Sequence, residues 1–157
     1  MKLTDAEIEQ LLTTQKTILN PGARRKTQNG SEQVNYDVID DDGIKFRLYV
    51  RQNTRVSNGF SCGLSFVTLT GETITLTRYN GSDHRHGNPL EGGDLLPMAC
   101  HIHRATERYM AAGRKADLYA ETTDRYTDLY GALKALLSDC KIQGLEKDYD
   151  TQQVELQ

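Results

Sequence analysis

All four histidines of this 157-residue chain lie between positions 84 and 103. His84 and His86 are two residues apart, and so are His101 and His103. On extended backbone that spacing points both side chains of a pair to the same face, so two facing pairs could converge. Imidazole can exchange a proton near neutral pH, bind a transition metal, or donate hydrogen bonds to phosphate when charged. The sequence therefore predicts one polar site built on these four residues.

Arginine, tyrosine and glutamate side chains close to the histidines suggest what the site would do. One histidine would accept the proton of a ribose 2′-hydroxyl, another would protonate the leaving oxygen, and an arginine would offset the phosphate charge. This is the chemistry of a metal-independent endoribonuclease, with Tyr79 or Tyr109 stacking on a base or donating a proton. Glu107 shares a face with His103 at either strand or helix spacing. The expected catalytic residues are His84, His86, His101, His103 and Glu107, and the expected substrate-binding residues are Arg78, Tyr79, Asn80, Arg85 and Arg104.

Three alternatives use the same residues differently. The histidines could form a mixed nitrogen and oxygen site for zinc, manganese or iron with Asp83, Glu91, Asp94 or Glu107, as in a metal-dependent hydrolase. They could instead satisfy hydrogen bonds in a loop folded over a sheet, without any reaction. Lastly, the acidic segments 40–42 and 117–128 could contact a basic target in a non-enzymatic interaction protein. Such a protein would be an antitoxin-like partner or a phage-encoded inhibitor of a host defence complex, for example an anti-CRISPR.

Arg78-Tyr79-Asn80-Gly81, followed by His84, His86 and the His101-Ile102-His103 pair, resembles the TumE-like toxin family of bacterial type II toxin–antitoxin systems. The similarity covers roughly positions 60 to 110. The family has Asp-Asn where this chain has Asn80-Gly81, and it has adjacent histidines where this chain separates two. The resemblance implies a cytoplasmic protein of a mobile element or defence locus that acts on RNA and has a cognate protein partner. It implies site roles for Arg78, Tyr79, Asn80, His84, His86, His101 and His103.

Composition and charge limit the classes of protein that fit. Apolar residues make up 37% and charged residues 26% of the chain, a composition compatible with a folded domain. The net charge of −3 gives no general attraction to a polyanion, so any contact with RNA must be local. Neither a signal peptide nor a membrane-spanning window is expected, which predicts a cytoplasmic protein that makes no membrane contact. Besides RNA and a cognate protein, a homodimer is expected among the partners; no cofactor is expected.

The elements that must position the site follow from hydrophobic periodicity. A capping box at Thr4–Glu7 starts a helix that is expected to run to Pro21, and a second helix is expected over 123–139. Alternating residues predict hairpins over 34–50 and 60–79, and a fifth strand, or alternatively a helix, over 101–115. The glycine-rich segment 80–97 is expected to be a functional loop. Three cysteines without CxxC spacing predict reduced, buried thiols.

These elements predict an α+β fold, in which an antiparallel sheet of four to five strands packs against an N-terminal and a C-terminal helix. One domain would cover residues 1–142, followed by a polar, frayed tail at 143–157.

Overall fold

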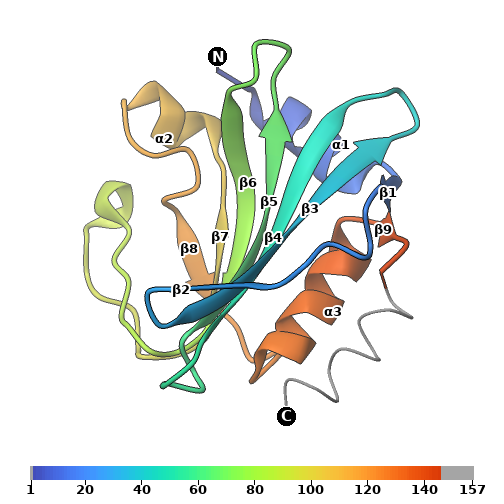
Figure 1. The fold of residues 1–157 in the computed structure, drawn as a ribbon. Coiled ribbons are helices and arrows are strands. Elements are labelled where there is room, and N and C mark those ends of the chain that lie inside the picture. Colours follow the sequence, from blue (N-terminus) through green and yellow to red (C-terminus); the bar gives the residue numbers. More distant parts are fainter. Residues whose placement is uncertain (1, 146–157) are drawn as a thin grey trace.

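The structure, a computed structural model, describes residues 2–145 and has an α+β fold (Figure 1). The elements are α1 (Asp5–Thr13), β1 (Lys16–Ile18), β2 (Lys26–Gln28), β3 (Ser31–Asp40), β4 (Lys45–Asn53), β5 (Phe60–Val67), β6 (Thr73–Asn80), the 3₁₀ turn η1 (Pro89–Glu91), β7 (His101–Arg104), α2 (Glu107–Ala111), β8 (Ala120–Thr122), α3 (Leu129–Asp139) and β9 (Ile142–Gln143). The predicted class is confirmed.

The sheet is larger than predicted and holds nine strands among the described residues. Its order is β8-β7-β6-β5-β4-β3-β1-β9, with β2 also paired to β3. Every pair is antiparallel except β1 with β9, so the sheet is mixed. The two predicted hairpins form its centre, as β3–β4 and β5–β6. The prediction of four to five strands covers β3 to β7 and misses β1, β2, β8 and β9, which are two or three residues long and too short to show a periodic pattern.

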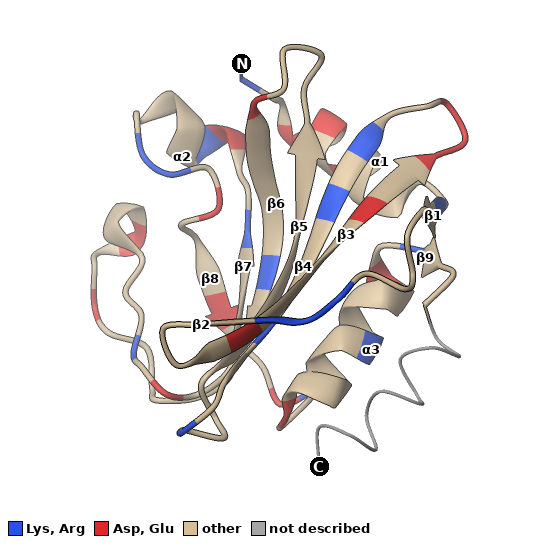
Figure 2. Cartoon of the chain, viewed as in Figure 1, with Lys and Arg blue, Asp and Glu red and all other residues tan. Residues whose placement is uncertain are grey.

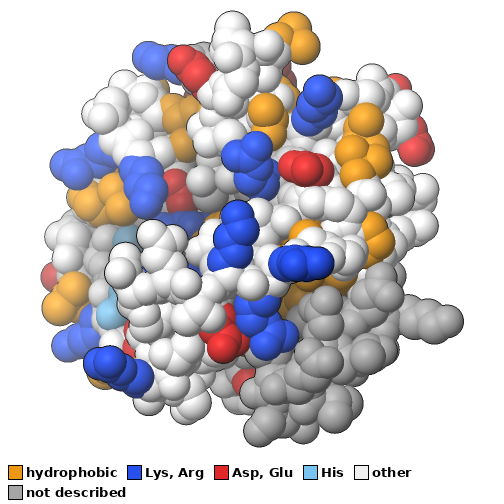
Figure 3. All heavy atoms as spheres, in the orientation of Figure 1, with side chains coloured by type: hydrophobic (Ala, Val, Ile, Leu, Met, Phe, Trp, Pro, Cys, Tyr) orange, Lys and Arg blue, Asp and Glu red, His pale blue; other side chains and the backbone are white. Residues whose placement is uncertain are grey.

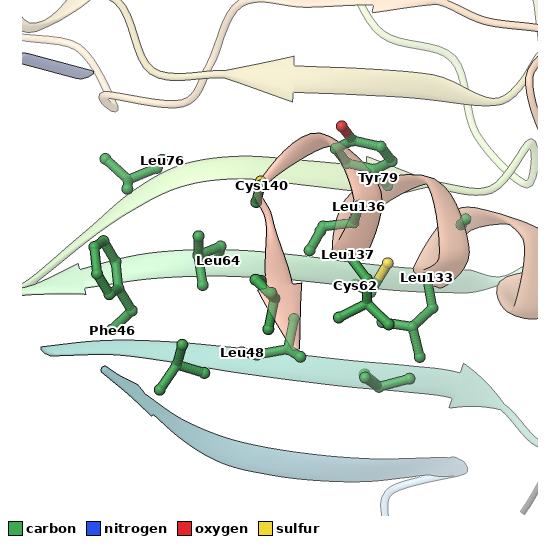
Figure 4. Packing of buried hydrophobic residues seen from close by; sticks show 14 of the residues in the cluster. Phe46, Leu48, Cys62, Leu64, Leu76, Tyr79, Leu133, Leu136, Leu137 and Cys140 are labelled. Carbon is green, nitrogen blue, oxygen red and sulfur yellow. The ribbon is translucent and has the colours of Figure 1, made fainter. Parts of the chain in front are cut away.

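The core lies on one face of the sheet, under α1 and α3. Alternate residues of the central strands, such as Leu48 and Leu64, meet Leu133 and Leu136 of α3, and all four are fully buried (Figure 4). Cys62, Cys100 and Cys140 are free and buried, as predicted. Because these apolar residues occupy one side of each strand, the intervening polar residues must lie on the opposite face, which we call the open face.

The first helix is shorter than predicted, because it ends at Thr13 and the chain then enters the sheet. Ile18, expected on the helix, instead pairs with Val38 of β3. Lys16 stabilises this change of direction: its Nζ donates to the carbonyl oxygens of Leu12, Thr14 and Cys140 at 2.8–2.9 Å. The leucine and isoleucine spacing up to position 19 was therefore read as one helix, although it comes from a helix and a strand whose apolar side chains are buried in the same core.

The second half of the chain also differs from its predicted boundaries. Helix α3 begins after Asp128, whose side chain accepts the backbone N–H of Gly131, and not near position 123. Tyr126 is buried outside the helix, where its hydroxyl donates to the carbonyl oxygen of Asn80. The ambiguous segment 101–115 contains both predicted alternatives, because strand β7 is followed by the short helix α2.

The expected domain boundary at position 142 is also displaced. Gln143 pairs with Thr17 in the sheet, and Leu145 is fully buried. The fold therefore includes these residues, and the rest of the expected tail, 146–157, lies outside the described residues. No helix in the described part of the chain is long and apolar enough to cross a membrane.

Candidate functional site

The strand register brings polar residues from distant parts of the chain together on the open face. Two cross-strand pairs lie at the β6–β7 boundary: Arg78 is opposite His103, and Asn80 is opposite His101. On the other side of β6, Asn80 is opposite Ser61, which is in turn opposite Arg51 of β4. Residues directly opposite in an antiparallel pair point to the same face. The two histidines of β7 therefore lie at one end of a polar row that crosses the sheet.

The four imidazole rings contact one another, because the loop after β6 returns over β7. The ring centroids of His101 and His103 are 5.1 Å apart, and His86 lies 4.6 Å from His103 and 5.9 Å from His101. His84 meets the ring of His101 edge to face, with the centroids 4.9 Å apart. The structure thus brings together the two histidine pairs, which are separated by fourteen residues that include η1.

Backbone acceptors determine which nitrogen of each β7 histidine carries a proton. His101 Nδ1 lies 3.0 Å from the carbonyl oxygen of Ala99, and His103 Nδ1 lies 2.9 Å from that of Asp117. A carbonyl oxygen can only accept, so in both rings Nδ1 donates and Nε2 has a lone pair when the ring is neutral. The Nε2 atom of His101 is buried and has no hydrogen-bond partner within residues 2–145. This free acceptor lies among the other imidazoles.

Asn88 fixes the third ring. Its Oδ1 accepts the backbone N–H of Ala120 at 2.9 Å, and its Nδ2 donates to the carbonyl oxygen of the same residue at 2.8 Å. These two hydrogen bonds to strand β8 determine the orientation of the Asn88 amide. His86 Nε2, 3.0 Å from Oδ1, must therefore donate, which leaves its Nδ1 as the acceptor. The same side chain ties the histidine loop to the edge of the sheet.

The fourth ring, that of His84, is the most exposed of the four. The side chain of His84 is 52% exposed, and its Nδ1 lies 2.8 Å from a carboxylate oxygen of Asp83. The carboxylate orients the imidazole and favours the tautomer in which Nε2 can accept a proton. His84 is therefore placed to exchange protons with a bound molecule.

The two β7 histidines have the opposite character. Burial lowers the pKa of His101 below its ordinary value of 6.5. Burial, followed by the positive charge of Arg78, lowers the pKa of His103 to about 3. Both rings are consequently neutral at pH 7, so they can accept hydrogen bonds but cannot supply a proton.

A groove of about 420 Å³ lies on the open face beside the histidines, and its lining includes Arg51, Arg78, Asn80, Asp83 and His84. This volume is within the usual range for a small-molecule site. The floor of the groove is a hydrogen-bonded series. Because the carbonyl of Asn80 can only accept, Ser61 Oγ donates to it at 2.8 Å, and the hydroxyl of Tyr49 then donates to Ser61 Oγ at 2.6 Å.

Arg78 is held in place from below. Its Nε donates to the carboxylate of Asp117, which is 1% exposed. Asp117 also supplies the carbonyl oxygen that accepts the Nδ1 proton of His103. One buried residue therefore positions both the arginine at the groove and the neutral histidine opposite it.

Two of the predicted site residues lie on the other face of the sheet, so their expected roles are corrected. The hydroxyl of Tyr79 donates to Asp139 of α3, and Arg104 pairs with Glu9 of α1. Both tyrosine and arginine line a larger cavity there, of about 560 Å³. Most of its charged lining residues are paired with each other, Arg125 bonding Asp139 through two nitrogens and Arg104 bonding Glu9, and no histidine lines it. The smaller groove is the better candidate because it adjoins the imidazoles.

Two more predicted residues are engaged elsewhere. Glu107 begins α2, where its carboxylate accepts the backbone N–H of Asp5 and its own N–H donates back to the Asp5 carboxylate. The chain turns between β7 and α2, so the face shared with His103 is lost. Arg85 is exposed and donates through Nε to the carbonyl oxygen of Leu96 within the loop.

The carboxylates expected in a metal site also have other partners. Glu91 pairs with Arg108 and accepts a hydrogen bond from the hydroxyl of Tyr109, which removes that tyrosine from the site. Asp83 holds His84, and Asp94 is exposed. Within residues 2–145, no three His, Cys, Asp or Glu side chains stand in an arrangement that could hold a metal ion.

Sequence reasoning missed Tyr49, Arg51, Ser61 and Asn88. The first three belong to the polar half of the alternation in β4 and β5, which showed that they share a face but not that they face the histidines. That fact depends on the register across three strands. No sequence signal identified Asn88, whose amide binds a strand thirty-two residues away.

Comparison with known proteins identifies a family without indicating an activity. No curated protein and no solved structure matches the chain. A family described as "family of unknown function (DUF6978)" matches residues 3–142. The matched region includes all four histidines and every complete strand of the sheet except β9. Because the match extends over most of its length, the chain belongs to the DUF6978 family.

Proposed function

We propose that this protein is a toxin-like, RNA-directed endoribonuclease whose reaction depends on its histidines. The observation that carries the proposal is the position of His84. This exposed imidazole is oriented by Asp83, contacts the buried His101, and lines the same groove as Arg78 and Asn80. A proton acceptor beside a fixed guanidinium is what cleavage of an RNA phosphodiester requires.

In the proposed reaction, His84 Nε2 accepts the proton of a ribose 2′-hydroxyl, and the 2′-oxygen attacks phosphorus. The bond from phosphorus to the 5′-oxygen breaks, and protonated His86 donates from Nδ1 to that leaving oxygen. The products are a 2′,3′-cyclic phosphate and a 5′-hydroxyl. Arg78 offsets the charge that accumulates on the phosphate. Neutral His101 and His103 are positioning residues that support the two reacting rings.

The biological setting is part of the proposal and rests on the TumE-like resemblance. It comprises a bacterial mobile-element or defence locus, a cytoplasmic site of action and a cognate protein partner. The acidic segments support the non-enzymatic alternative only in part, because Asp41, Asp42, Glu121 and Asp124 are exposed whereas the other acidic residues have roles within the fold. Asp40 and Asp117 are buried, and Asp128 caps α3.

The test is cleavage of structured and unstructured RNA in EDTA by the wild type and by His84→Gln, His86→Gln and a His101→Ala/His103→Ala variant. We expect the first two substitutions to reduce the rate by about 10²–10⁴-fold. Arg114→Gln is the control, because Arg114 is an exposed arginine outside the histidine loop. Identical traces from wild type and all histidine variants would refute the catalytic role. Cleavage that appears only when EDTA is replaced by zinc or manganese would favour a metal-dependent hydrolase.

A further inference from the structure

We propose that the substrate is single-stranded RNA and that the strand crosses the open face from the histidines to Lys26 of β2, perpendicular to the β-strands. This inference rests on the proposed function for the choice of RNA over other polyanions. It adds the class of RNA, its path and the length of the site.

The register defines the path. At one level of the sheet, the residues opposite one another in successive strands are Lys26, Gln33, Arg51, Ser61, Asn80 and His101. At the next level the corresponding residues are Asn35, Tyr49, Gly63, Arg78 and His103. Because opposite residues share a face, the two levels form one continuous polar track from β7 to β2.

The charge of the track favours a polyanion although the whole chain has a net charge of −3. Lys26, Arg51 and Arg78 follow one another along it, separated by uncharged side chains. Three carboxylates lie beside the track, and each has a partner: Asp117 pairs with Arg78, Asp83 is bonded to His84, and Asp37 is opposite Arg47. Figure 3 shows the Lys and Arg side chains gathered over the middle of this face, and Figure 2 locates them on β2, β4 and β6. Spaced cations of this kind match the phosphates of one strand.

The floor of the track suits a base that is not paired to another. Gly63 permits close packing here: a Cβ at that position would be 2.6 Å from Cε1 of Tyr49 and 3.1 Å from Cγ of Arg78. The ring and the arginine stem therefore lie against the backbone, with the hydroxyl of Tyr49 anchored on Ser61. A fixed aromatic ring beside a guanidinium is a stacking platform for a single-stranded base. In an A-form duplex the paired bases are stacked inside the helix and could not reach it.

The dimensions predict the size of the site. From β7 to β2 the track spans five intervals between strands, or roughly 24 Å at the usual strand spacing. That length corresponds to about four nucleotides, at the lower end of single-strand sites on small β-rich domains. Affinity should therefore rise with oligonucleotide length up to about four nucleotides and then level off.

The test measures fluorescence anisotropy of labelled 2′-O-methyl oligouridines of two, four, six and eight nucleotides, which cannot be cleaved, and of a twelve-base-pair RNA duplex. We expect a plateau near four nucleotides and at least tenfold weaker binding of the duplex. Arg51→Gln and Lys26→Gln should each weaken binding about 3- to 10-fold and reduce the slope of log affinity against log salt by about 0.7. Lys134→Gln is the matched control, because this exposed lysine is on α3, across the sheet.

The outcomes separate this inference from the proposed function. Equal affinity for duplex and single strand, or unchanged binding by both Arg51→Gln and Lys26→Gln, would refute the proposal that single-stranded RNA binds along the track. This holds whether or not the protein cleaves RNA. Length-dependent binding that both variants weaken, without any cleavage by the wild type, would support the track and refute the ribonuclease. Cleavage without measurable binding to any oligouridine would overturn the track alone.

Discussion

His84 and His101 meet edge to face with their ring centroids 4.9 Å apart, although one side chain is half exposed and the other is 2% exposed. The contact joins a surface imidazole, which can exchange protons with a substrate, to a buried imidazole that stays neutral. The Nε2 of His101, which has no hydrogen-bond partner within residues 2–145, provides an acceptor beside His84 and His86. In the proposed reaction, proton exchange at His84 would therefore depend on a neutral imidazole that is held in place behind it.

Asp83→Asn should reduce RNA cleavage about 10- to 100-fold, less than the loss caused by His84→Gln. The carboxylate accepts the Nδ1 proton of His84, and an asparagine could instead present its amide N–H and favour the other tautomer. The measurement is kcat/KM between pH 5 and pH 9. Asp94→Asn, an exposed aspartate of the same loop, is the control. If Asp83→Asn retained the wild-type rate and pH profile, Asp83 would not orient the base.

Stability should fall as the solution is made more acid than about pH 6.5. The pKa of His103 is about 3 in the folded chain and near 6.5 when unfolded, so between these values the unfolded state binds the additional proton. The free energy of unfolding therefore increases with pH across this window, by up to about 1.4 kcal/mol per pH unit for one histidine. The lowered pKa of His101 acts in the same direction.

Urea unfolding at pH 4.5, 5.5, 6.5 and 7.5 would measure this dependence. His103→Gln should have a flatter profile than the wild type, because glutamine can still donate to the carbonyl of Asp117 but does not titrate. Parallel profiles for the two proteins would mean that burial of His103 does not couple folding to protonation.

Much of the site followed from residue spacing, and one error could have been avoided by the same reasoning. The two-residue spacing of His101 and His103 correctly indicated a shared face on β7. On a strand that contains Arg78 and Asn80, however, Tyr79 must point to the opposite face, and the structure places it against α3. Arg104 follows His103 and is excluded for the same reason. Strand alternation determines which neighbours can share a site.

The remaining errors arose from contacts distant in the sequence. Nothing in residues 14–19 shows that the chain leaves the helix at Thr14. The apolar spacing suits either element, and the carbonyl oxygens that accept from Lys16 belong to the ends of two helices, one of them far along the chain. Glu107 does not lie in the site as predicted, because it begins α2, where Asp5, more than a hundred residues earlier, accepts its N–H. Local periodicity could predict the hairpins but not these pairings.

Asn88→Ala should loosen both the edge strand β8 and the histidine loop. The substitution leaves the N–H and the carbonyl of Ala120 without their partner and removes the acceptor of His86. A loss of about 1–3 kcal/mol in the free energy of unfolding is expected. Hydrogen exchange at the Ala120 amide should become faster, while the amide of Leu48 in the central sheet should change little. Unchanged protection at Ala120 would contradict the proposed tie.

Gly63→Ala should destabilise the fold and disturb the groove. The added methyl would lie 2.8 Å from the carbonyl oxygen of Thr77 as well as 2.6 Å from Tyr49, and the backbone oxygen cannot move without bending β6. We expect a cost of about 1–3 kcal/mol in unfolding free energy, together with weaker oligouridine binding. Gly22→Ala is the control, because nothing lies within 4 Å of a Cβ there. Equal stability of the two variants would show that Tyr49 and Arg78 do not depend on close approach to this strand.

Lys16→Ala should be among the more destabilising single substitutions. The Nζ of Lys16, whose residue is 1% exposed, donates to three carbonyl oxygens and lies 5.0 Å from the ring centroid of Phe46. Removing it leaves the carbonyl groups at the ends of α1 and α3 without a donor and creates a cavity, for an expected loss of about 2–5 kcal/mol. Thermal and urea unfolding would measure this loss. Lys134→Ala is the matched control on the exposed side of α3, and its effect should be within about 0.5 kcal/mol. If the two lysine variants unfolded at the same urea concentration, Lys16 would not be what joins the two helix ends to the sheet.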